Sequence, residues 1–245
     1  MMYDKILRTE DGSLTLVHEE LDQAYHSHMG AQKEAIELYL KSSGFEQNLP
    51  THPHLWVLDV GLGLGYNAFS TISYWHTHQG SQNLSLVSLE RDETLVRLLT
   101  EGKGKWMKNW PDHWFSLATS LIPTEYGYQL SLPHPYHNGN LLWNIYVGEA
   151  ERWPYQEYLG KFHYCFHDPF SPEKNPRMWS RDWFAKLSQV ACQNIVLVTY
   201  SVARVVRDHL TAAGWECMKI PTPGSKKAWL KAKLARPTTV QGVDE

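Results

Sequence analysis

The chain has 245 residues, of which 42% are hydrophobic and 20% are charged, and its formal net charge is −3 at pH 7. This is an ordinary globular composition without an overall positive field, so a nucleic-acid partner would need a local basic patch. The three cysteines lie far apart without a CxxC pair, so neither a disulfide framework nor a zinc site is indicated. No apolar run reaches the roughly 20 residues of a membrane span, so we expect a cytoplasmic protein without a membrane partner.

The first fifty residues predict a small extension ahead of the main domain. LTLVH follows the turn in TEDGS and is typical of a short strand. Residues 31–42 have the apolar spacing of a helix, which Gly44 would end. We expect residues 1–50 to form a strand and helix extension that contributes to the functional site.

The rest of the chain alternates between apolar runs and helical segments. Continuous apolar runs predict buried strands at 55–60, 84–90, 141–147, 161–168 and 194–200. A helical insertion with a mobile loop is predicted at 102–140, a short helix in ERWPYQEYL, and a hairpin where WECMKI and AWLKAKL flank PTPGSKK. The tail at 237–245 is predicted to be disordered.

This alternation of strand and helix predicts an α/β protein with a mostly parallel sheet and a terminal antiparallel hairpin. The pattern resembles the Rossmann-like fold of class I S-adenosylmethionine (SAM)-dependent methyltransferases. We expect the methyltransferase domain to span residues 51–236. In open sheets of this kind, ligands bind outside the carboxyl ends of the strands.

VLDVGLGLGYN (57–67) follows the first parallel strand and opens a helix. Its glycines allow a tight turn and close approach of a ligand to the backbone. Tyr66 stands where a GxGxxG dinucleotide fingerprint has its last glycine, which makes a pyrophosphate ligand less favoured. The acid of the motif can meet a cationic group such as the methionine amine of SAM; the alternative is a turn without a ligand. The predicted cofactor-binding residues are Asp59, Gly61, Gly63, Gly65 and Asn67.

Acids also end the next strands. Glu90 ends the second strand, where a carboxylate can accept both ribose hydroxyls of a nucleoside, although an acid there often only begins a helix. Glu149 ends the third strand and is predicted to meet the adenine, unless it merely caps the following helix. Asp168 ends the fourth strand in HDPFSPEKNPRMWS (167–180), beside the expected position of the SAM methyl group; the alternative is that it only caps an Asp-Pro turn.

Beyond the fold, the sequence resembles one family over nearly its whole length. It is similar to the methyltransferase domain of the bacterial tRNA 5-methylaminomethyl-2-thiouridine biosynthesis (MnmC-type) proteins, in a stand-alone form. The matching stretches are TEDGSLTL, YHSHMGAQKEA, VLDVGLGLGYN, HDPFSPEKNPRMWS, VTYSVARVVRDHLTAAGWE and PGSKKAWL. The chain departs from the family pattern at HDPF, at Leu62 and Leu64, and at Lys226-Lys227.

The resemblance implies methyl transfer from SAM to the aminomethyl nitrogen of 5-aminomethyl-(2-thio)uridine at the tRNA wobble position. Asp168 would orient the amine more than act as a strong base, since the reference pKa of aspartate is about 3.9. Because the family's flavin oxidase domain is not expected here, a separate FAD-dependent oxidase would supply the substrate. Tyr25 would join the SAM site, and Asp168 would line it. The implied substrate-binding residues are Phe170, Asn175, Trp179, Lys226 and Lys227.

Several features keep alternative interpretations open. KGKWMK (103–108) and SKKAWLKAKLAR (225–236) interleave lysine with tryptophan, which suits tRNA contact; the alternative for each is an ordinary solvated face. Trp179 would equally suit a core position. His163 and His167 lack a third ligand, so no metal is expected. The alternative functions are SAM-dependent methylation of a small-molecule amine, a polyamine synthase-like activity, and a non-catalytic SAM- or tRNA-binding module.

Overall fold

The computed structural model describes residues 5–78, 83–223 and 227–235. Within these residues, the main sheet has nine strands in the order β11-β12-β10-β9-β4-β5-β8-β7-β6. Its centre is parallel, and consists of β10 (Ala191–Thr199), β9 (Phe162–His167), β4 (His54–Val60), β5 (Asn83–Glu90) and β8 (Asn140–Val147). All five central strands lie where the sequence predicts strands, and the α/β fold with a mainly parallel centre is confirmed.

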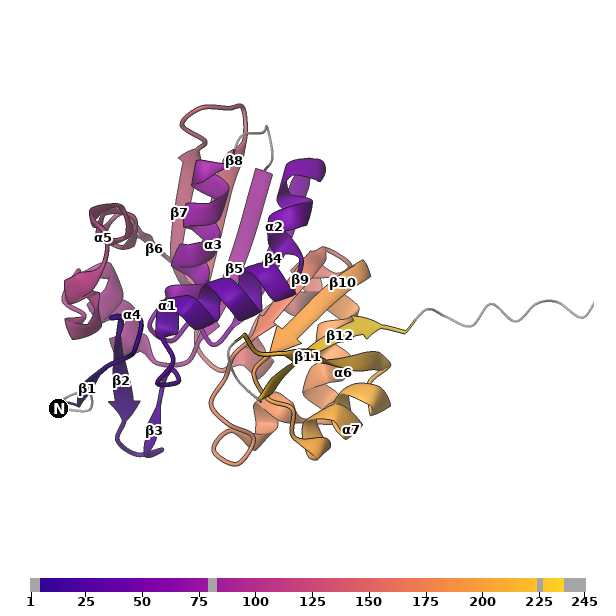
Figure 1. The fold of residues 1–245 in the computed structure, drawn as a ribbon. Coiled ribbons are helices and arrows are strands. Elements are labelled where there is room, and N and C mark those ends of the chain that lie inside the picture. The colour runs from indigo at the N-terminus through magenta and orange to yellow at the C-terminus, as the bar shows by residue number, and fades with distance from the viewer. Residues whose placement is uncertain (1–4, 79–82, 224–226, 236–245) are drawn as a thin grey trace, which may run out of the picture.

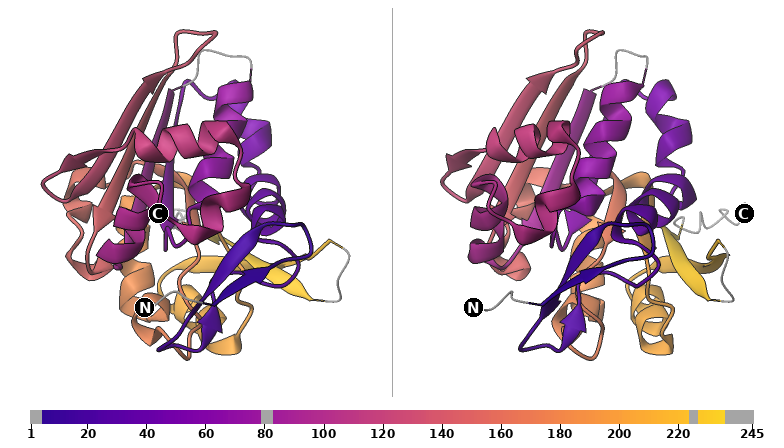
Figure 2. Two further views of the ribbon diagram at one scale, coloured as in Figure 1. Left: turned by 90° about the vertical axis from the view of Figure 1, so that its left-hand side faces the viewer. Right: turned by 60° about the vertical axis from the view of Figure 1, so that its left-hand side comes forward.

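An antiparallel hairpin borders the parallel strands on each side, at opposite ends of the sheet (Figure 2). The predicted terminal hairpin is present as β11 (Trp215–Pro221) and β12 (Ala228–Leu234), with β12 paired to β10. The second hairpin, β6 (Ile122–Thr124) and β7 (Gly127–Pro133), lies where only a helical insertion and a loop were expected. Each of these two strands contains a proline, and a proline argues against a strand when only the sequence is considered. Proline is nevertheless tolerated near the edge of a sheet, so the hairpin could not be predicted from its residues alone.

Helices cover both faces of the sheet (Figure 1). One face packs against α6 (Arg181–Val190) and α7 (Arg204–Ala212). The other face packs against a larger group: α1 (Ala31–Glu34), η1 (Ala35–Ser42), α2 (Phe45–Asn48), α3 (Tyr66–Thr77), α4 (Glu93–Thr100), η3 (Lys105–Asn109) and α5 (Asp112–Thr119). The strands are therefore buried on both sides, which explains why they read as continuous apolar runs.

The predicted helix at 31–42 is α1 followed by a π-helical segment, η1. The remaining short helices are 3₁₀ turns: η2 (Leu49–Thr51), η4 (Ala150–Arg152), η5 (Tyr155–Tyr158) and η6 (Pro176–Trp179). The helix expected in ERWPYQEYL is divided into η4 and η5, because Pro154 between them cannot donate a backbone hydrogen bond. The predicted disordered tail lies outside the described residues.

The described N-terminal residues form a separate three-stranded sheet of β1 (Ile6–Arg8), β2 (Leu14–His18) and β3 (Gln23–Ala24). It lies beside the main sheet rather than in it, near the start of α1 (Figure 1). The Ser171 N–H donates to the Gln23 side-chain carbonyl over 3.3 Å. This contact brings residues of the extension to the loop that follows β9.

Candidate functional site: a cavity at the carboxyl edge of the sheet

A cavity of about 690 Å³ opens at the carboxyl ends of β4, β5, β8 and β9. β4 and β9 are neighbours in the sheet, but the chain leaves β4 toward β5 and returns later to β9. That reversal of strand order is the point where open α/β sheets bind ligands. The volume lies in the usual range for small-molecule and cofactor sites.

The glycine turn between β4 and α3 forms the floor of this cavity. Gly61 has φ +89°, and a Cβ added there would lie 2.8 Å from the Asp168 carbonyl oxygen. Gly63 has φ +52° and faces the Tyr25 ring, while Gly65, at φ +90°, begins α3 beneath the Phe69 ring. Glycine is required at these positions because the left-handed backbone and the close neighbours exclude a side chain.

Glu90 is fixed against this turn. One carboxylate oxygen accepts from the Gly63 N–H over 2.8 Å, and the other accepts from the N–H groups of Arg91 and Asp92 over 2.8 and 2.9 Å. Burial raises the pKa of Glu90, and these backbone hydrogen bonds oppose the rise. Three of the roughly four acceptor sites of the carboxylate are therefore filled, and the oxygen that accepts from Gly63 keeps one site for a ribose hydroxyl.

Asp168 stands at the end of β9, where its backbone N–H donates to the Val60 carbonyl over 2.9 Å. The Asn67 side-chain amide donates to its carboxylate over 2.9 Å. Burial and the nearby charge of Glu34 raise the pKa of Asp168 well above the usual range, and the Tyr39 and Asn67 side chains oppose that rise. The site therefore holds a carboxylate that readily takes a proton or a cationic partner.

Aromatic side chains line the mouth of the cavity. Phe170 packs edge-on against Tyr25 and His18, with ring centroids 4.9 and 5.3 Å apart. Lys174 and Arg177 lie exposed on the same loop and add positive charge to the rim. The mouth thus combines apolar rings with cationic groups, which suits an aromatic and anionic ligand.

The structure brings most of the predicted site residues together. The cavity is lined by Tyr25, Gly61, Gly63, Glu90, Glu149, Asp168, Phe170 and Asn175. Gly65 and Asn67 support the lining from behind, as their contacts with Phe69 and Asp168 show. Lys227 lies elsewhere, in a second cavity, and Lys226 lies outside the described residues.

Two predicted contacts need correction. Asp59 is fully buried behind the cavity wall, where one carboxylate oxygen accepts from the Ser88 hydroxyl over 2.8 Å. Its other oxygen has no hydrogen-bond partner in the described part of the chain. Trp179 is only 2% exposed, and its indole N–H donates to the Phe170 carbonyl over 2.8 Å. Trp179 therefore fixes the loop from the core, and Asp59 does not face the ligand space.

The basic cluster at 103–108 also differs from expectation. Trp106 is 1% exposed, and its indole N–H donates to the Leu64 carbonyl over 3.1 Å. Lys103 pairs with Glu101 on the surface. The tryptophan of this cluster is therefore a core residue that supports the glycine turn, and its ring is not available for stacking on a base.

Sequence reasoning missed Glu34, Tyr39 and Tyr200, which surround the far side of Asp168. The Tyr200 hydroxyl donates to the Pro169 carbonyl over 2.9 Å, and the charge of Asp168 contributes to the raised pKa of both tyrosines. Glu34 lies in the stretch 25–35 that carries the family resemblance, which was the available signal. Its position beside Asp168 could not be inferred, since the two residues are far apart in the chain.

The chain is similar to several known proteins. A family model described as S-adenosyl-L-methionine-dependent methyltransferase matches residues 127–235. The chain is 26% identical over 232 residues to the tRNA 5-methylaminomethyl-2-thiouridine biosynthesis bifunctional protein MnmC of Aromatoleum aromaticum, with 92% of this chain and 34% of that protein covered. It is 28% identical over 243 residues to an uncharacterised protein of Methanocaldococcus jannaschii, covering 98% of this chain and 63% of that one.

Solved structures share the fold. A crystal structure of MNMC2 from Aquifex aeolicus matches with a TM-score of 0.79 and 24% identity, over 95% of this chain and 71% of that one. Spermidine synthase from Thermotoga maritima matches with a TM-score of 0.52 and 9% identity, over 95% and 72%. The chain spans about a third of the length of the bifunctional MnmC relative.

The cavity fits SAM on its own geometry. The glycines, which leave no room for a Cβ, let a ligand approach the backbone at the base of the cavity, and Glu90 keeps one acceptor site beside them. Within the described residues, no group of three or more histidine, cysteine or acidic side chains could hold a metal ion, and no helix is long and apolar enough to cross a membrane. In the stretch that the family model matches, the chain is similar to S-adenosyl-L-methionine-dependent methyltransferases, and over most of its length it is similar to part of the MnmC proteins and shares the fold of MNMC2.

Proposed function

We propose that the protein methylates the aminomethyl nitrogen of 5-aminomethyl-(2-thio)uridine at the wobble position of tRNA. The observation that carries this proposal is the position of Asp168 at the cavity that fits SAM, held by Asn67 and followed by the loop with Phe170. The name of the MnmC relative points to the same modified uridine. Residues 1–50 and 51–236 would serve one site, since Tyr25 and Gly61 line the same cavity.

The geometry of the cavity supports a proposal for the residues that hold SAM. The turn at Gly61 and Gly63 would receive the methionine part, Glu90 the ribose hydroxyls, and Glu149 the adenine edge. Bound SAM supplies an electrophilic methyl group on a sulfonium sulfur. Asp59 would act from behind the cavity wall through the Ser88 hydroxyl, which donates to its carboxylate.

Asp168 would prepare the acceptor amine. A primary amine attacks only as the neutral base, because its lone pair must be free. A carboxylate whose pKa is raised by burial can accept an N–H hydrogen bond, and can take the ammonium proton more readily than an ordinary aspartate. Asn67 fixes the orientation of that carboxylate, so positioning contributes together with proton acceptance.

The tRNA would approach from the rim. Lys174 and Arg177 are exposed at the mouth of the cavity and suit phosphate contact, while Phe170 offers a ring edge to a splayed base. A base that is modified inside a pocket must leave its stack. The proposal includes an upstream FAD-dependent oxidase, supplied separately, that exposes the free aminomethyl group.

The test is transfer of labelled methyl from SAM to tRNA that carries unmethylated 5-aminomethyl-uridine, followed by nucleoside analysis. We expect a labelled 5-methylaminomethyl nucleoside. If SAM binds in the same sample but no label enters the tRNA, the tRNA substrate is wrong and small-molecule amines become the acceptors to assay.

A further inference from the structure

A second cavity of about 300 Å³ lies between the N-terminal extension and the terminal hairpin. The residues that matter for its chemistry are Met29, Glu34, Tyr200, Thr222, Lys227 and Trp229. A hydrogen bond links the linings of the two cavities: Tyr200 lines the second cavity, and its hydroxyl donates to the carbonyl of Pro169, which lines the first.

The walls of the second cavity offer flat apolar surface. Thr199 of β10 pairs with Leu230 of β12, so Tyr200 and Trp229 are the next residues in this antiparallel register. Both rings are half-buried and line the cavity. Base–aromatic contact of this kind is the usual way to hold a single unstacked base.

Thr222 provides a polar group that the fold does not use. Its side chain is 5% exposed and lines the second cavity. Its hydroxyl has no hydrogen-bond partner among the residues that the structure describes. Because an unmade buried hydrogen bond costs about 1–3 kcal/mol, a ligand in the cavity that bonds this hydroxyl would recover that cost.

Glu34 provides the charge. Burial raises its pKa, and hydrogen bonds from Ser27 and the positive charge of Lys227 oppose the rise. The charge of Glu34 in turn raises the pKa of Asp168, so the two carboxylates are close enough to repel each other. A cation placed between them would relieve that repulsion.

We propose that the second cavity binds the acceptor uridine, with Thr222 on the polar edge of the base and Glu34 facing the aminomethyl ammonium. This inference rests on the proposed function and names the acceptor side of the same site. The amine would lie between Glu34 and Asp168, at the junction of the two cavities. Charge complementarity selects a cationic aminomethyl group over the uncharged 5-position of ordinary uridine.

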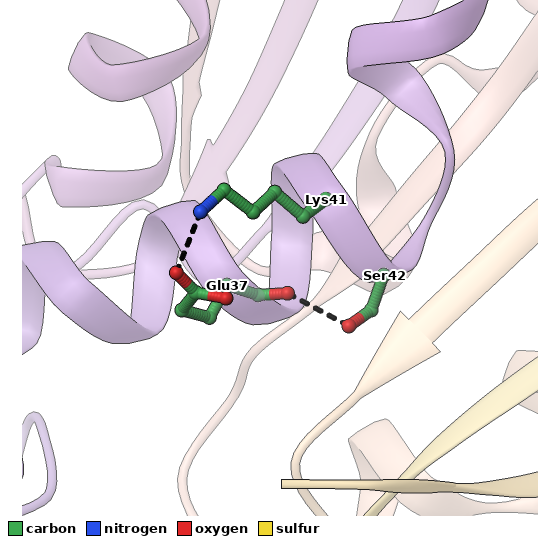
Figure 3. Close-up of polar contacts among 3 residues, drawn as sticks. All are labelled: Glu37, Lys41 and Ser42. Carbon is green, nitrogen blue, oxygen red and sulfur yellow. Dashed lines mark hydrogen bonds and ion pairs between the residues drawn. The ribbon is translucent and has the colours of Figure 1, made fainter. Parts of the chain in front are cut away.

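Glu37 is the matched control, since it lines the same cavity one turn after Glu34. Its carboxylate already pairs with the Lys41 ammonium over 2.7 Å, and its backbone carbonyl accepts from the Ser42 hydroxyl over 2.7 Å (Figure 3). Glu37→Gln therefore removes one carboxylate from the cavity and leaves the carboxylates of Glu34 and Asp168 unchanged.

The experiment measures methyl transfer to 5-aminomethyl-uridine tRNA and SAM affinity for the wild type, Glu34→Gln, Thr222→Val and Glu37→Gln. We expect the KM for the acceptor to rise about tenfold or more in Glu34→Gln, because a hydrogen bond to a charged group is lost, and severalfold in Thr222→Val. Glu37→Gln should stay within about twofold, and SAM affinity should be unchanged throughout. Thr222→Val should also resist denaturant at least as well as the wild type, which separates a binding role from a structural one.

Unchanged acceptor KM in both Glu34→Gln and Thr222→Val would overturn the inference. If the wild type binds SAM but methylates no tRNA, the proposed function fails. The inference about the second cavity is then tested separately, by calorimetric binding of 5-aminomethyl-uridine and of uridine to the protein. Tighter binding of 5-aminomethyl-uridine than of uridine, lost in Glu34→Gln, would keep the inference, and equal binding of the two would overturn it.

Discussion

The Asn67 side-chain amide donates to the Asp168 carboxylate over 2.9 Å, and so joins the helix after β4 to the loop after β9. The two residues are 101 positions apart in the chain. Both belong to motifs at the carboxyl edge of the sheet, where the Asp168 backbone also meets Val60 and Gly61. This connection places the proposed reacting carboxylate directly beside the turn proposed to hold the methyl donor.

Asp168→Asn keeps the size of the side chain and removes its charge and its ability to take a proton. We expect kcat for methyl transfer to fall by about 10²–10³, in line with the usual contribution of a positioned acid–base group. SAM affinity, measured by equilibrium dialysis, should change only severalfold. A variant that keeps full kcat would show that Asp168 serves only as a turn residue.

Glu90→Gln replaces a carboxylate that accepts three backbone N–H hydrogen bonds by an amide, whose NH₂ group cannot accept them. We expect SAM to bind about tenfold or more weakly, because charge-assisted hydrogen bonds are lost and the ribose acceptor is weakened. Glu93→Gln is the control, since Glu93 lines the same cavity but is exposed at the start of α4. Equal affinities of the two variants would argue against a ribose-binding role for Glu90.

Gly61→Ala tests the close approach between the glycine turn and Asp168. We expect the free energy of unfolding to fall by about 2–4 kcal/mol, from a left-handed backbone and a Cβ without room. Gly214→Ala is the matched control, because Gly214 has φ +87° and no described atom lies within 4 Å of its added Cβ. That control should lose only about 1–2 kcal/mol in urea denaturation. Equal losses would mean that the turn can move away from Asp168.

Asp59→Asn tests the buried carboxyl behind the cavity. Burial raises the pKa of Asp59 to about 7 in the folded protein, from 3.8. Between about pH 4 and pH 7 the folded state therefore binds more protons than the unfolded state, and stability falls as the pH rises. Relative to the wild type, the variant should gain stability across this window, by up to about 4 kcal/mol above pH 7.

Urea denaturation of both proteins at several pH values from 4.5 to 8 measures this difference. The raised pKa values of Asp168 and Glu34 act in the same direction, but they are present in both proteins and largely cancel. A difference in stability that stays constant with pH would show that Asp59 ionises in the folded protein as it does in the unfolded chain.

The sequence alone determined the parallel core and the residues at its carboxyl edge. Continuous apolar runs such as 84–90 and 161–168 are typical of strands buried on both faces, and Glu90 and Asp168, at the ends of these two runs, line the same cavity. This works because strand burial and turn chemistry are local properties, and because parallel strands bring their carboxyl ends to the same edge.

Only the tertiary structure decided which side chains face the ligand space. Asp59 and Trp179 turned out to be buried, since the face that a residue presents depends on what packs against it. The hairpin of β6 and β7 exists because β8 offers it an unpaired edge. Glu34 and Thr222 come from the two ends of the chain and meet at one cavity, a contact between distant segments that local periodicity does not encode.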